Sequence, residues 1–174
     1  MEDIATHVGM SKRTVYARYA DKASLFNAAV RRAIQRYTVP REMIEAVATD
    51  DLEATLTAVA RLRIANLATP VATRLQRILN AQSYRFPELF NVSFEEGTGP
   101  TIHFLCDLFT RCTARGELNL TEPRRAAAAF LSLVVGGPAR IILSGNVLDE
   151  QEIATRVRFA VRLFLDGARP REGK

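Results

Sequence analysis

The segment from Asp3 to Lys22, DIATHVGMSKRTVYARYADK, decides the fold of the N-terminal region. Gly9 separates two short helical stretches, because only glycine adopts a left-handed backbone without a steric penalty. Ser11 is a suitable N-cap for the second stretch, since its hydroxyl accepts a hydrogen bond from a free backbone N–H. Two short helices joined by a glycine-containing turn predict a helix-turn-helix, whose second helix enters the DNA major groove.

The predicted second helix carries side chains suited to nucleic acid. Lysine and arginine neutralise phosphates or contact guanine edges, and hydroxyl groups donate to phosphate oxygens. Val15 and Tyr19, four residues apart, are expected to face inward. A solvated charged face on an ordinary helix is the alternative interpretation, and the Gly9 turn, the Ser11 cap and the downstream Lys22 favour DNA. The polar side chains concerned are Lys12, Arg13, Thr14, Tyr16 and Arg18.

The net charge of +5 is concentrated at the N-terminus of this 174-residue chain. Residues 1–41 hold eight lysines and arginines against three acidic residues, whereas the remaining 133 residues hold sixteen of each sign. This distribution is the electrostatic pattern of a nucleic-acid-binding head on a neutral body. The overall composition, 48% hydrophobic and 25% charged, is ordinary for a soluble domain.

The two cysteines, Cys106 and Cys112, lie six residues apart on one predicted helix. That spacing turns them about 240° apart around the helix axis, so a shared metal or a disulfide is disfavoured. A reduced, cytoplasmic protein is the simplest interpretation. We identify no signal peptide and expect no apolar run long enough to cross a bilayer.

Apolar residues recur at helical spacing along the chain, and no stretch alternates with period two, so the fold is predicted to be all-α. Pro40 and the cluster Thr49-Asp50-Asp51 mark a joint. Thr121 is expected to cap the helix predicted over residues 121–144, and Gly136-Gly137-Pro138 is expected to kink or interrupt that helix. Helices are predicted over residues 21–37, 51–68, 70–85, 101–115, 121–144 and 149–168, with a short irregular or helical piece between Pro87 and Pro100.

The last two predicted helices carry more apolar surface than a single small chain easily covers. Two faces of helix 121–144 and one stripe of helix 149–168 are apolar. Two copies could hide these faces in a four-helix bundle across a two-fold axis. The predicted interface residues are Phe130, Leu131, Val134, Val135, Ile142, Ile153, Val157, Val161 and Phe164.

Several polar residues interrupt the apolar stripes of the central helices and suggest a small-molecule pocket with aromatic walls. The alternative is that Arg63 and Arg140 extend to solvent or pair with a carboxylate, and that Gln82 bonds a neighbouring carbonyl. A core without a cavity between residues 51 and 115 would exclude the pocket. The predicted ligand-binding residues are Arg63, Gln82, Phe86, Phe94, His103 and Phe109, with Arg140 as a further candidate.

Residues for enzymatic chemistry are scarce. Only two histidines occur, and no Ser/His/Asp set can be assembled from the sequence. Gly97-Thr98-Gly99 lacks the lysine and the preceding strand of a phosphate-binding loop. We therefore predict no catalytic residue, no metal site and no cofactor.

The N-terminal segment resembles the DNA-binding signature of TetR-type transcriptional regulators. The matching pieces are Ile4-Ala5, Gly9-Met10-Ser11, Thr14-Val15-Tyr16 and Tyr19-Ala20-Asp21-Lys22-Ala23-Ser24-Leu25-Phe26. The resemblance implies that the groove is faced by Lys12, Arg13, Tyr16, Ala17 and Arg18. It also implies phosphate contacts by Thr14, Tyr16 and Lys22.

The C-terminal part is similar to the AefR-like branch of the same family, through RLQRILNAQSYRFPELFNVSFEEG at residues 74–97 and Gly116-Glu117-Leu118. The resemblance implies a DNA-binding domain over residues 1–40 and a ligand-binding and dimerisation domain over residues 41–174. It further implies a homodimeric repressor that a small-molecule inducer releases from a palindromic operator. The alternative is a small-molecule-binding helical dimer whose vestigial head does not bind DNA.

One departure from the family pattern concerns the helix that usually precedes this segment, since Met1 stands where the second helix begins. Without that first helix we expect Ile4, Val8, Val15 and Phe26 to lack a packing partner. Each half-buried large side chain would then forgo roughly 1.5–3 kcal/mol. DNA binding by the chain as given is expected to be impaired.

Overall fold

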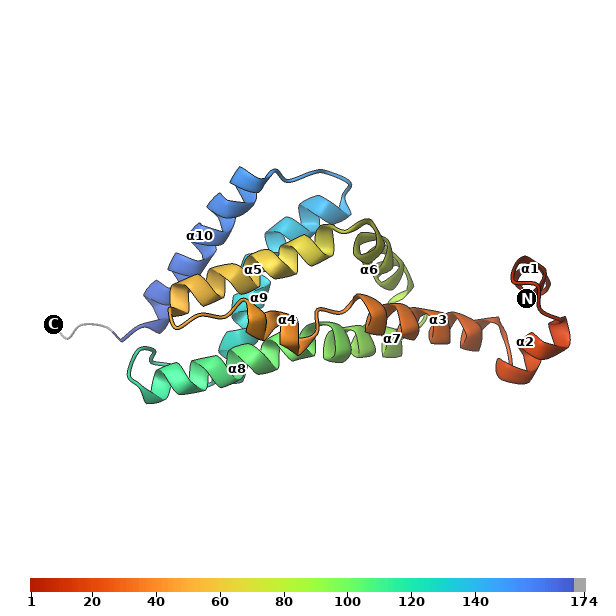
Figure 1. Ribbon diagram of the computed structural model, residues 1–174, viewed down its shortest axis with the longest axis horizontal. Coiled ribbons are helices and arrows are strands. Elements are labelled where there is room, and N and C mark those ends of the chain that lie inside the picture. Colours follow the sequence, from red (N-terminus) through yellow and green to blue (C-terminus); the bar gives the residue numbers. More distant parts are fainter. Residues whose placement is uncertain (171–174) are drawn as a thin grey trace.

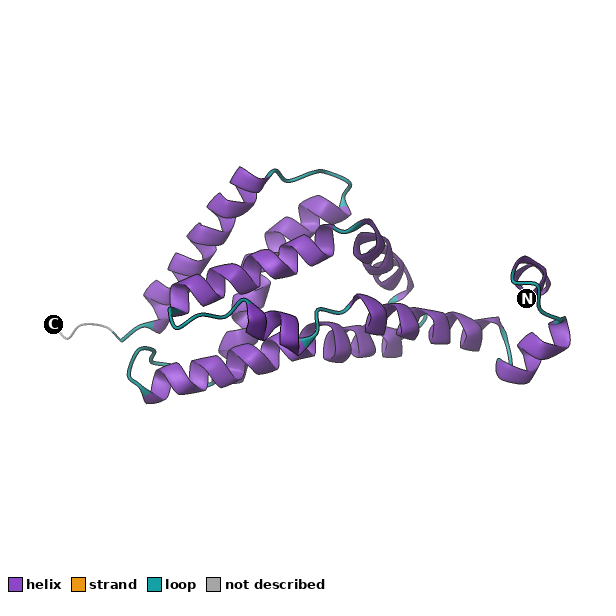
Figure 2. Cartoon of the chain, viewed as in Figure 1, coloured by secondary structure: helices purple, strands orange, loops and turns teal. Residues whose placement is uncertain are grey.

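The computed structural model describes residues 1–170, which form helices joined by short loops and contain no strand (Figures 1 and 2). The all-α prediction is therefore confirmed. The helices are α1 (Glu2–His7), α2 (Lys12–Arg18), α3 (Lys22–Tyr37), α4 (Arg41–Ala46), α5 (Leu52–Ala68), α6 (Pro70–Gln82), α7 (Pro87–Val92), the π-helix η1 (Ser93–Thr98), α8 (Gly99–Ala114), α9 (Pro123–Leu143) and α10 (Glu150–Ala168).

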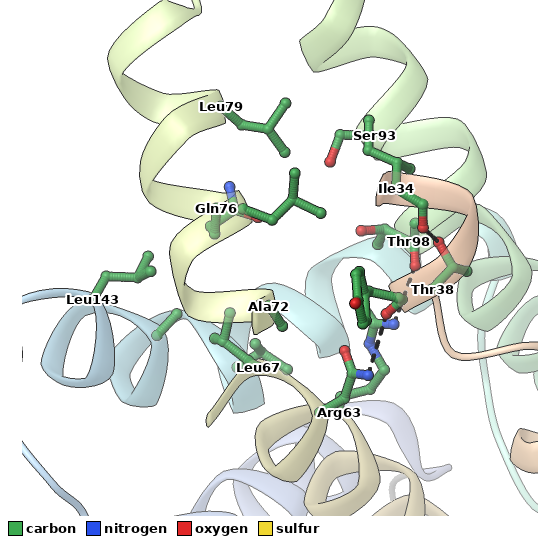
Figure 3. A pocket seen from close by; sticks show the side chains of 16 residues that line it. Ile34, Thr38, Arg63, Leu67, Ala72, Gln76, Leu79, Ser93, Thr98 and Leu143 are labelled. Atoms are coloured by element: carbon green, nitrogen blue, oxygen red, sulfur yellow. Dashed lines mark hydrogen bonds between the residues drawn. The ribbon is translucent and has the colours of Figure 1, made fainter. Parts of the chain in front are cut away.

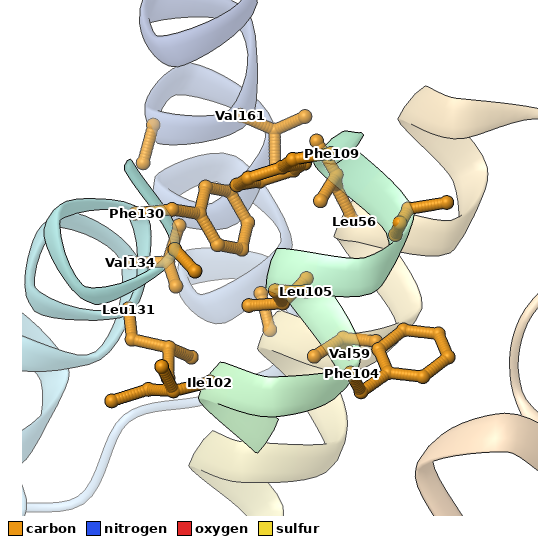
Figure 4. Close-up of a cluster of buried hydrophobic side chains, with 14 of the residues drawn as sticks. Leu56, Val59, Ile102, Phe104, Leu105, Phe109, Phe130, Leu131, Val134 and Val161 are labelled. Atoms are coloured by element: carbon orange, nitrogen blue, oxygen red, sulfur yellow. The ribbon is translucent and has the colours of Figure 1, made fainter. Parts of the chain in front are cut away.

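The main hydrophobic core lies where α5, α8, α9 and α10 pack together (Figure 4). Its centre is aromatic: the Phe109 ring stacks on Phe164 at 5.3 Å between centroids and meets Phe130 edge-on at 6.4 Å. Leu56 and Leu105 are fully buried beside these rings. Burial of apolar surface at about 25 cal/mol per Å² makes this cluster the principal source of stability.

A second, smaller cluster connects α3 to the body. Val30 and Ile34 of α3 pack with Leu79 of α6 and Leu89 of α7, and all four are buried. The long helix α3 therefore belongs structurally to the body at its C-terminal end, while its N-terminal end extends toward α1 and α2 (Figure 1).

The head, which we define as α1 and α2 (residues 1–20), projects from one end of the molecule (Figure 1). Gly9 has a φ of 65°, as a tight turn between two helices requires. The Ser11 hydroxyl accepts a hydrogen bond from the Thr14 N–H at 3.1 Å and caps α2. The turn and cap predicted from the sequence are both present.

Most predicted helix boundaries agree with the structure, because their caps are visible in the sequence. Asp51 and Asp149 accept N–H bonds at the starts of α5 and α10, Pro70 occupies the first turn of α6, and Gly116 has a φ of 75° after α8. Both cysteines are free, as their spacing indicated.

Three local predictions were wrong. The short helix α4 fills the joint after Pro40, where no helix was expected. Thr121 does not cap α9: the N-cap position is Glu122, which makes no side-chain capping bond. The run Gly136-Gly137-Pro138, expected to kink or interrupt this helix, does not interrupt α9, which includes Pro138 as a buried residue, and a kink there stays a prediction. Packing of α9 against α5, α8 and α10 offsets the backbone hydrogen bond that Pro138 cannot donate.

The predicted dimer residues lie in the chain's own core. Phe130, Val134, Val157 and Val161 are each at most 2% exposed, and Leu131 and Ile142 are also buried. Val135, Ile153 and Phe164 are partly buried against the same core. The two apolar faces of α9 are thus covered by α5, α8 and α10 within one chain, which the sequence alone could not show.

Helix α9 also differs from the expectation that no apolar run is long enough to cross a bilayer. By length and composition alone, α9 is long and apolar enough to cross a bilayer. A core helix of a soluble protein passes the same test, and α9 contributes Phe130, Leu131, Val134 and Ile142 to the main core, while Leu133 is exposed.

Candidate nucleic-acid interface and ligand pocket

Helix α2 presents its polar side chains to solvent. Val15 is only 6% exposed, and Tyr19 at the C-cap is half-buried, so these two face inward as predicted. The residues expected to contact DNA are all exposed, namely Lys12, Arg13, Thr14, Tyr16, Ala17, Arg18 and Lys22. Their exposure makes them accessible to an external polyanion.

Local hydrogen bonds fix the two ends of this surface. The Lys12 ammonium lies 3.3 Å from a Glu2 carboxylate oxygen, so α1 and α2 are also joined by an exposed ion pair. At the start of α3, the Asp21 carboxylate accepts a hydrogen bond from the Ser24 N–H at 2.7 Å. In return, the Ser24 hydroxyl oxygen accepts one from the Asp21 N–H. Hydrogen bonds from Ser24 lower the pKa of the Asp21 carboxyl, because they stabilise its charged form. This capping box holds Lys22 in the first turn of α3.

Positive charge continues along α3, where Arg31, Arg32 and Arg36 are all exposed. The basic N-terminal segment found in the sequence therefore lies on the surface of the head and α3. Arg41 is an exception, since it pairs with Glu45 and Asp107 of the body.

The packing expected of the head was partly wrong. Ile4 and Val8 are 38% and 53% exposed, in agreement with the expectation that they lack a partner. Val15, however, is buried, and Phe26 packs on Phe86 with 5.2 Å between ring centroids. The partner of Phe26 is thus Phe86, the N-cap residue of α7, a contact between residues sixty apart that the sequence does not reveal.

A cavity of about 240 Å³ lies between α3, α5, α6, η1 and the C-terminal half of α9 (Figure 3). Leu67, Leu75, Leu79, Val135 and Leu143 form its apolar part. Its polar groups come from Tyr37, Thr38, Arg63, Asn66, Gln76, Ser93 and Thr98. A core without a cavity, which would have excluded the predicted pocket, is therefore not observed, and the pocket stays a prediction. Ile34 of α3 and Thr38, which directly follows α3, also line the cavity. The helix that leads to the head therefore forms part of the cavity wall.

Among residues 1–170, Arg63 is the only charged side chain on the wall of this cavity. Its Nη1 donates to the Gly97 carbonyl of η1 at 3.1 Å, and no carboxylate among residues 1–170 pairs with it. Burial lowers the pKa of the Arg63 guanidinium, since desolvation disfavours its charge. The guanidinium nevertheless stays protonated, because arginine starts from a very high pKa. The predicted alternative, in which Arg63 pairs with a carboxylate, does not apply.

A neighbouring hollow of about 230 Å³ shares Arg63, Thr98 and Val135 with this cavity and adds Phe94. Of the six predicted ligand-binding residues, Arg63 and Phe94 therefore line hollows of this region. The other four lie elsewhere, as does Arg140.

Helical geometry explains the four misplaced residues. Gln82 stands six residues beyond the lining residue Gln76, which is about 9 Å along the axis of α6. His103 is exposed, turned about 100° from the buried Ile102. Phe86 packs on Phe26, and Phe109 is fully buried in the main core.

The polar lining residues that the sequence analysis missed are Tyr37, Thr38, Asn66, Gln76, Ser93 and Thr98. Asn66 could have been found, since it follows Arg63 by three residues on one helix face. Gln76 likewise precedes the buried Leu79 by three. The contribution of α3 depends on the docking of α3 against α6 and η1, for which the sequence carries no signal.

The outer faces of α9 and α10 expose large apolar side chains. Leu133 is 41% exposed, Phe159 70% and Leu163 52%. Phe159 and Leu163 are four residues apart, so they lie on one face of α10. Within the described part of the chain, no group of three His, Cys, Asp or Glu residues is arranged to hold a metal ion.

An exposed basic helix-turn-helix joined by one helix to a larger helical body is the architecture of a transcriptional regulator. Residues 1–29 match the bacterial regulatory proteins of the tetR family, and residues 54–167 match the C-terminal domain of AefR-like transcriptional repressors. The chain belongs to the TetR family of transcriptional regulators.

Solved structures agree with this assignment. A putative TetR-family transcriptional regulator from Mesorhizobium loti MAFF303099 has a TM-score of 0.78 at 26% identity, covering 97% of this chain and 86% of its own. The flavonoid-responsive regulator FrrA has a TM-score of 0.77 at 29% identity, covering 99% and 87%. A protein of unknown function from Rhodococcus sp. RHA1 shares the fold at 19% identity, with a TM-score of 0.68 over 97% and 84%. Among curated proteins none matches the chain significantly.

Proposed function

We propose that this regulator is a cytoplasmic homodimeric repressor that a small organic molecule releases from a palindromic operator. The observation that carries the proposal is the position of the cavity: its wall includes Ile34 and Tyr37 of α3, the helix that leads to the head. A ligand that fits the cavity best when α3 is displaced would shift the head. A ligand acts only through such a difference in affinity between two states.

The exposed residues of α2 are proposed to bind operator DNA. Lys12, Arg13, Tyr16, Ala17 and Arg18 face the major groove in this proposal. Thr14, Tyr16 and Lys22 hold phosphates, and the excess positive charge of the head and α3 supports this use. In a two-fold dimer the two α2 helices would occupy successive major grooves, which makes the operator palindromic.

The proposed dimer interface is the outer face of α9 and α10, formed by Leu133, Phe159 and Leu163, in place of the buried residues predicted from the sequence. Adjacent exposed apolar side chains of this size favour a partner surface. Phe159→Asp is expected to convert the dimer into a monomer in sedimentation velocity, because it places a charge within the interface. Tyr84→Asp, at a fully exposed position of the body, is the control and should remain dimeric.

The test of DNA binding is fluorescence anisotropy of a labelled duplex from the gene's own upstream region, with a scrambled duplex as reference, at two salt concentrations. Tight, salt-sensitive binding to the upstream duplex alone is expected. Tyr16→Ala should weaken it, while Arg124→Ala on α9 should not. Weak and equal binding to both duplexes would favour the ligand-binding dimer whose head does not bind DNA, the alternative that the exposed Ile4 and Val8 support.

The test of release adds candidate molecules to the protein–DNA complex. Flavonoids are the first set, because the structurally similar FrrA is named as flavonoid-responsive. The expected result is a fall in anisotropy to that of the free duplex. A complex that withstands every compound known to bind the chain would contradict release by a ligand.

A further inference from the structure

The charge balance inside the cavity has an unusual feature. Within the part of the chain that the structure describes, Arg63 is the sole ionised side chain that lines the cavity or the neighbouring hollow, and no aspartate or glutamate lines either of them. A partly buried cation without an opposite charge is unfavourable, because desolvation is not repaid by a partner. Such a group is retained most simply when a bound molecule supplies the missing charge.

Arg63 has unused capacity to bind an anion. Its one hydrogen bond within the described chain is from Nη1 to the Gly97 carbonyl, which is a neutral acceptor. A guanidinium carries further N–H donors in a planar fork that matches the two oxygens of a carboxylate. Charge-assisted bonds of this type are shorter and stronger than bonds to a carbonyl.

The rest of the cavity indicates an organic molecule instead of an inorganic ion. Figure 3 shows Leu67, Leu79 and Leu143 around the space beside Arg63. Gln76 and Ser93 lie on opposite sides of that space, on α6 and η1. An apolar body therefore has a surface to lie against, with polar groups at its edges.

We propose that the effector of this regulator is a small organic carboxylate whose charge binds the Arg63 guanidinium and whose apolar part lies among the leucines of α5, α6 and α9. This inference rests on the proposed function, in which the same cavity receives the effector.

The geometry also supplies a route from ligand to head. Gly97 belongs to the π-helix η1, which packs against α3, and a Cβ at this position would lie 3.9 Å from Oγ1 of Thr38, the C-cap residue of α3. A carboxylate that binds Arg63 competes with the Gly97 carbonyl for the guanidinium. Release of that carbonyl weakens the attachment of η1 to α5 and changes the support of α3. π-Helices are rare and frequently occur at functional sites.

The experiment compares matched probes that differ in charge alone. We choose 3-phenylpropionate, cinnamate and 4-hydroxycinnamate, each with its primary amide, and measure Kd by calorimetry and the shift of Tm on the full chain. The carboxylates should bind and raise Tm, whereas the amides should bind at least about tenfold more weakly.

Variants identify the residue responsible. Arg63→Met should weaken carboxylate binding by about ten- to a hundredfold and leave amide binding unchanged, and Arg63→Lys should restore part of the affinity. Arg74→Met on α6, an exposed arginine outside the cavity, is the matched control and should bind as the wild type does. The Tm of ligand-free Arg63→Met should equal or exceed that of the wild type, because an unpaired cation is removed. A lower Tm would indicate a structural arginine.

Three results would overturn the proposal: no carboxylate binds, the amides bind as well as the acids, or carboxylate binding survives in Arg63→Met. Failure of the proposed function looks different. If carboxylates bind through Arg63 but leave the protein–DNA complex intact, the effector role fails while the anion site stands. If amides or other neutral molecules release the DNA, the repressor role stands and the carboxylate assignment fails.

Discussion

The head and the body of this regulator differ in how their residues are used. In residues 1–20 only Ala5 and Val15 are buried, and the remaining side chains are exposed or half-buried. The body instead packs four helices around a continuous core with fully buried rings and leucines. Few buried apolar contacts mean a low free energy of local opening. The difference teaches that stability arises in the body, while the residues proposed to read DNA carry little packing.

Helix α3 connects the two regions and shares the properties of both. Its exposed arginines extend the basic surface of the head, while Val30 and Ile34 are buried against α6 and α7. In the proposed function, a ligand that displaces α3 would move the head, which is attached at the N-terminal end of this helix. The following predictions test the contrast between the regions.

The largest effect is expected in the core of the body. Phe109→Ala removes a fully buried ring that contacts Phe130 and Phe164, and should lower the free energy of unfolding by about 3–5 kcal/mol. Urea denaturation followed by circular dichroism measures this change. Tyr84→Ala, at a fully exposed position, should stay within about 0.5 kcal/mol of the wild type. A loss below about 1 kcal/mol for Phe109→Ala would contradict the described core.

A smaller and local effect is expected at the turn of the head. Gly9→Ala places a side chain on a residue with a φ of 65°, which costs about 1–2 kcal/mol. Hydrogen exchange should therefore accelerate about five- to thirtyfold in residues 2–18 and remain unchanged in α8. Gly167→Ala is the control: it lies inside α10 with nothing near the added methyl group, and should stabilise the body by up to about 1 kcal/mol. Equal acceleration throughout the chain would show that the regions open together.

The proposed phosphate contact of Lys22 gives an effect on DNA binding alone. Lys22→Ala should make the plot of log K against log salt concentration shallower by about 0.9, for operator and scrambled duplexes alike. Between 50 and 200 mM salt, the ratio of wild-type to Lys22→Ala affinity should therefore change by about three- to fourfold. Anisotropy titrations measure it, with Arg125→Ala on α9 as the control. An unchanged slope would remove Lys22 from the phosphate contacts.

The smallest effect concerns the pH dependence of the cap on α3. The pKa of Asp21 is lowered in the folded chain, so its capping contribution is complete above the unfolded value of about 3.9. That contribution is lost as the pH falls through the folded pKa. Asp21→Ala should therefore lower the thermal midpoint at neutral pH but match the wild type in strong acid. Asp21→Asn retains an N-cap without a charge, and its cap should not depend on pH. A difference that persists in acid would exclude the carboxylate as its source.

Local features of the fold were predictable from the sequence because their causes are local. Gly9, Ser11, Asp51, Pro70, Asp149 and Gly116 each act on backbone groups within a few residues, so the corresponding helix ends were found. Helix α4 was missed because its six residues follow Pro40 without a side-chain cap. Pro138 was expected to interrupt α9, but tertiary packing overrides the local preference.

The candidate sites show the same division. The surface of α2 could be predicted, since exposure there follows from helical periodicity once Val15 faces inward. The cavity could be placed among the central helices, and Arg63 lines it. Gln82, His103 and Phe109 do not line it, because an apolar stripe along one helix does not reveal which helix packs against it.

By itself the sequence determined the helical class, the basic head with its turn and caps, and membership in the TetR family through motifs of fixed spacing. Only the tertiary structure decided which apolar residues of α9 and α10 are core and which remain exposed, that Phe26 packs on Phe86, and that Arg63 faces a cavity bounded by α3. The physical reason is range: capping and backbone preference act within one helical turn, whereas burial depends on segments that meet only after the chain has folded.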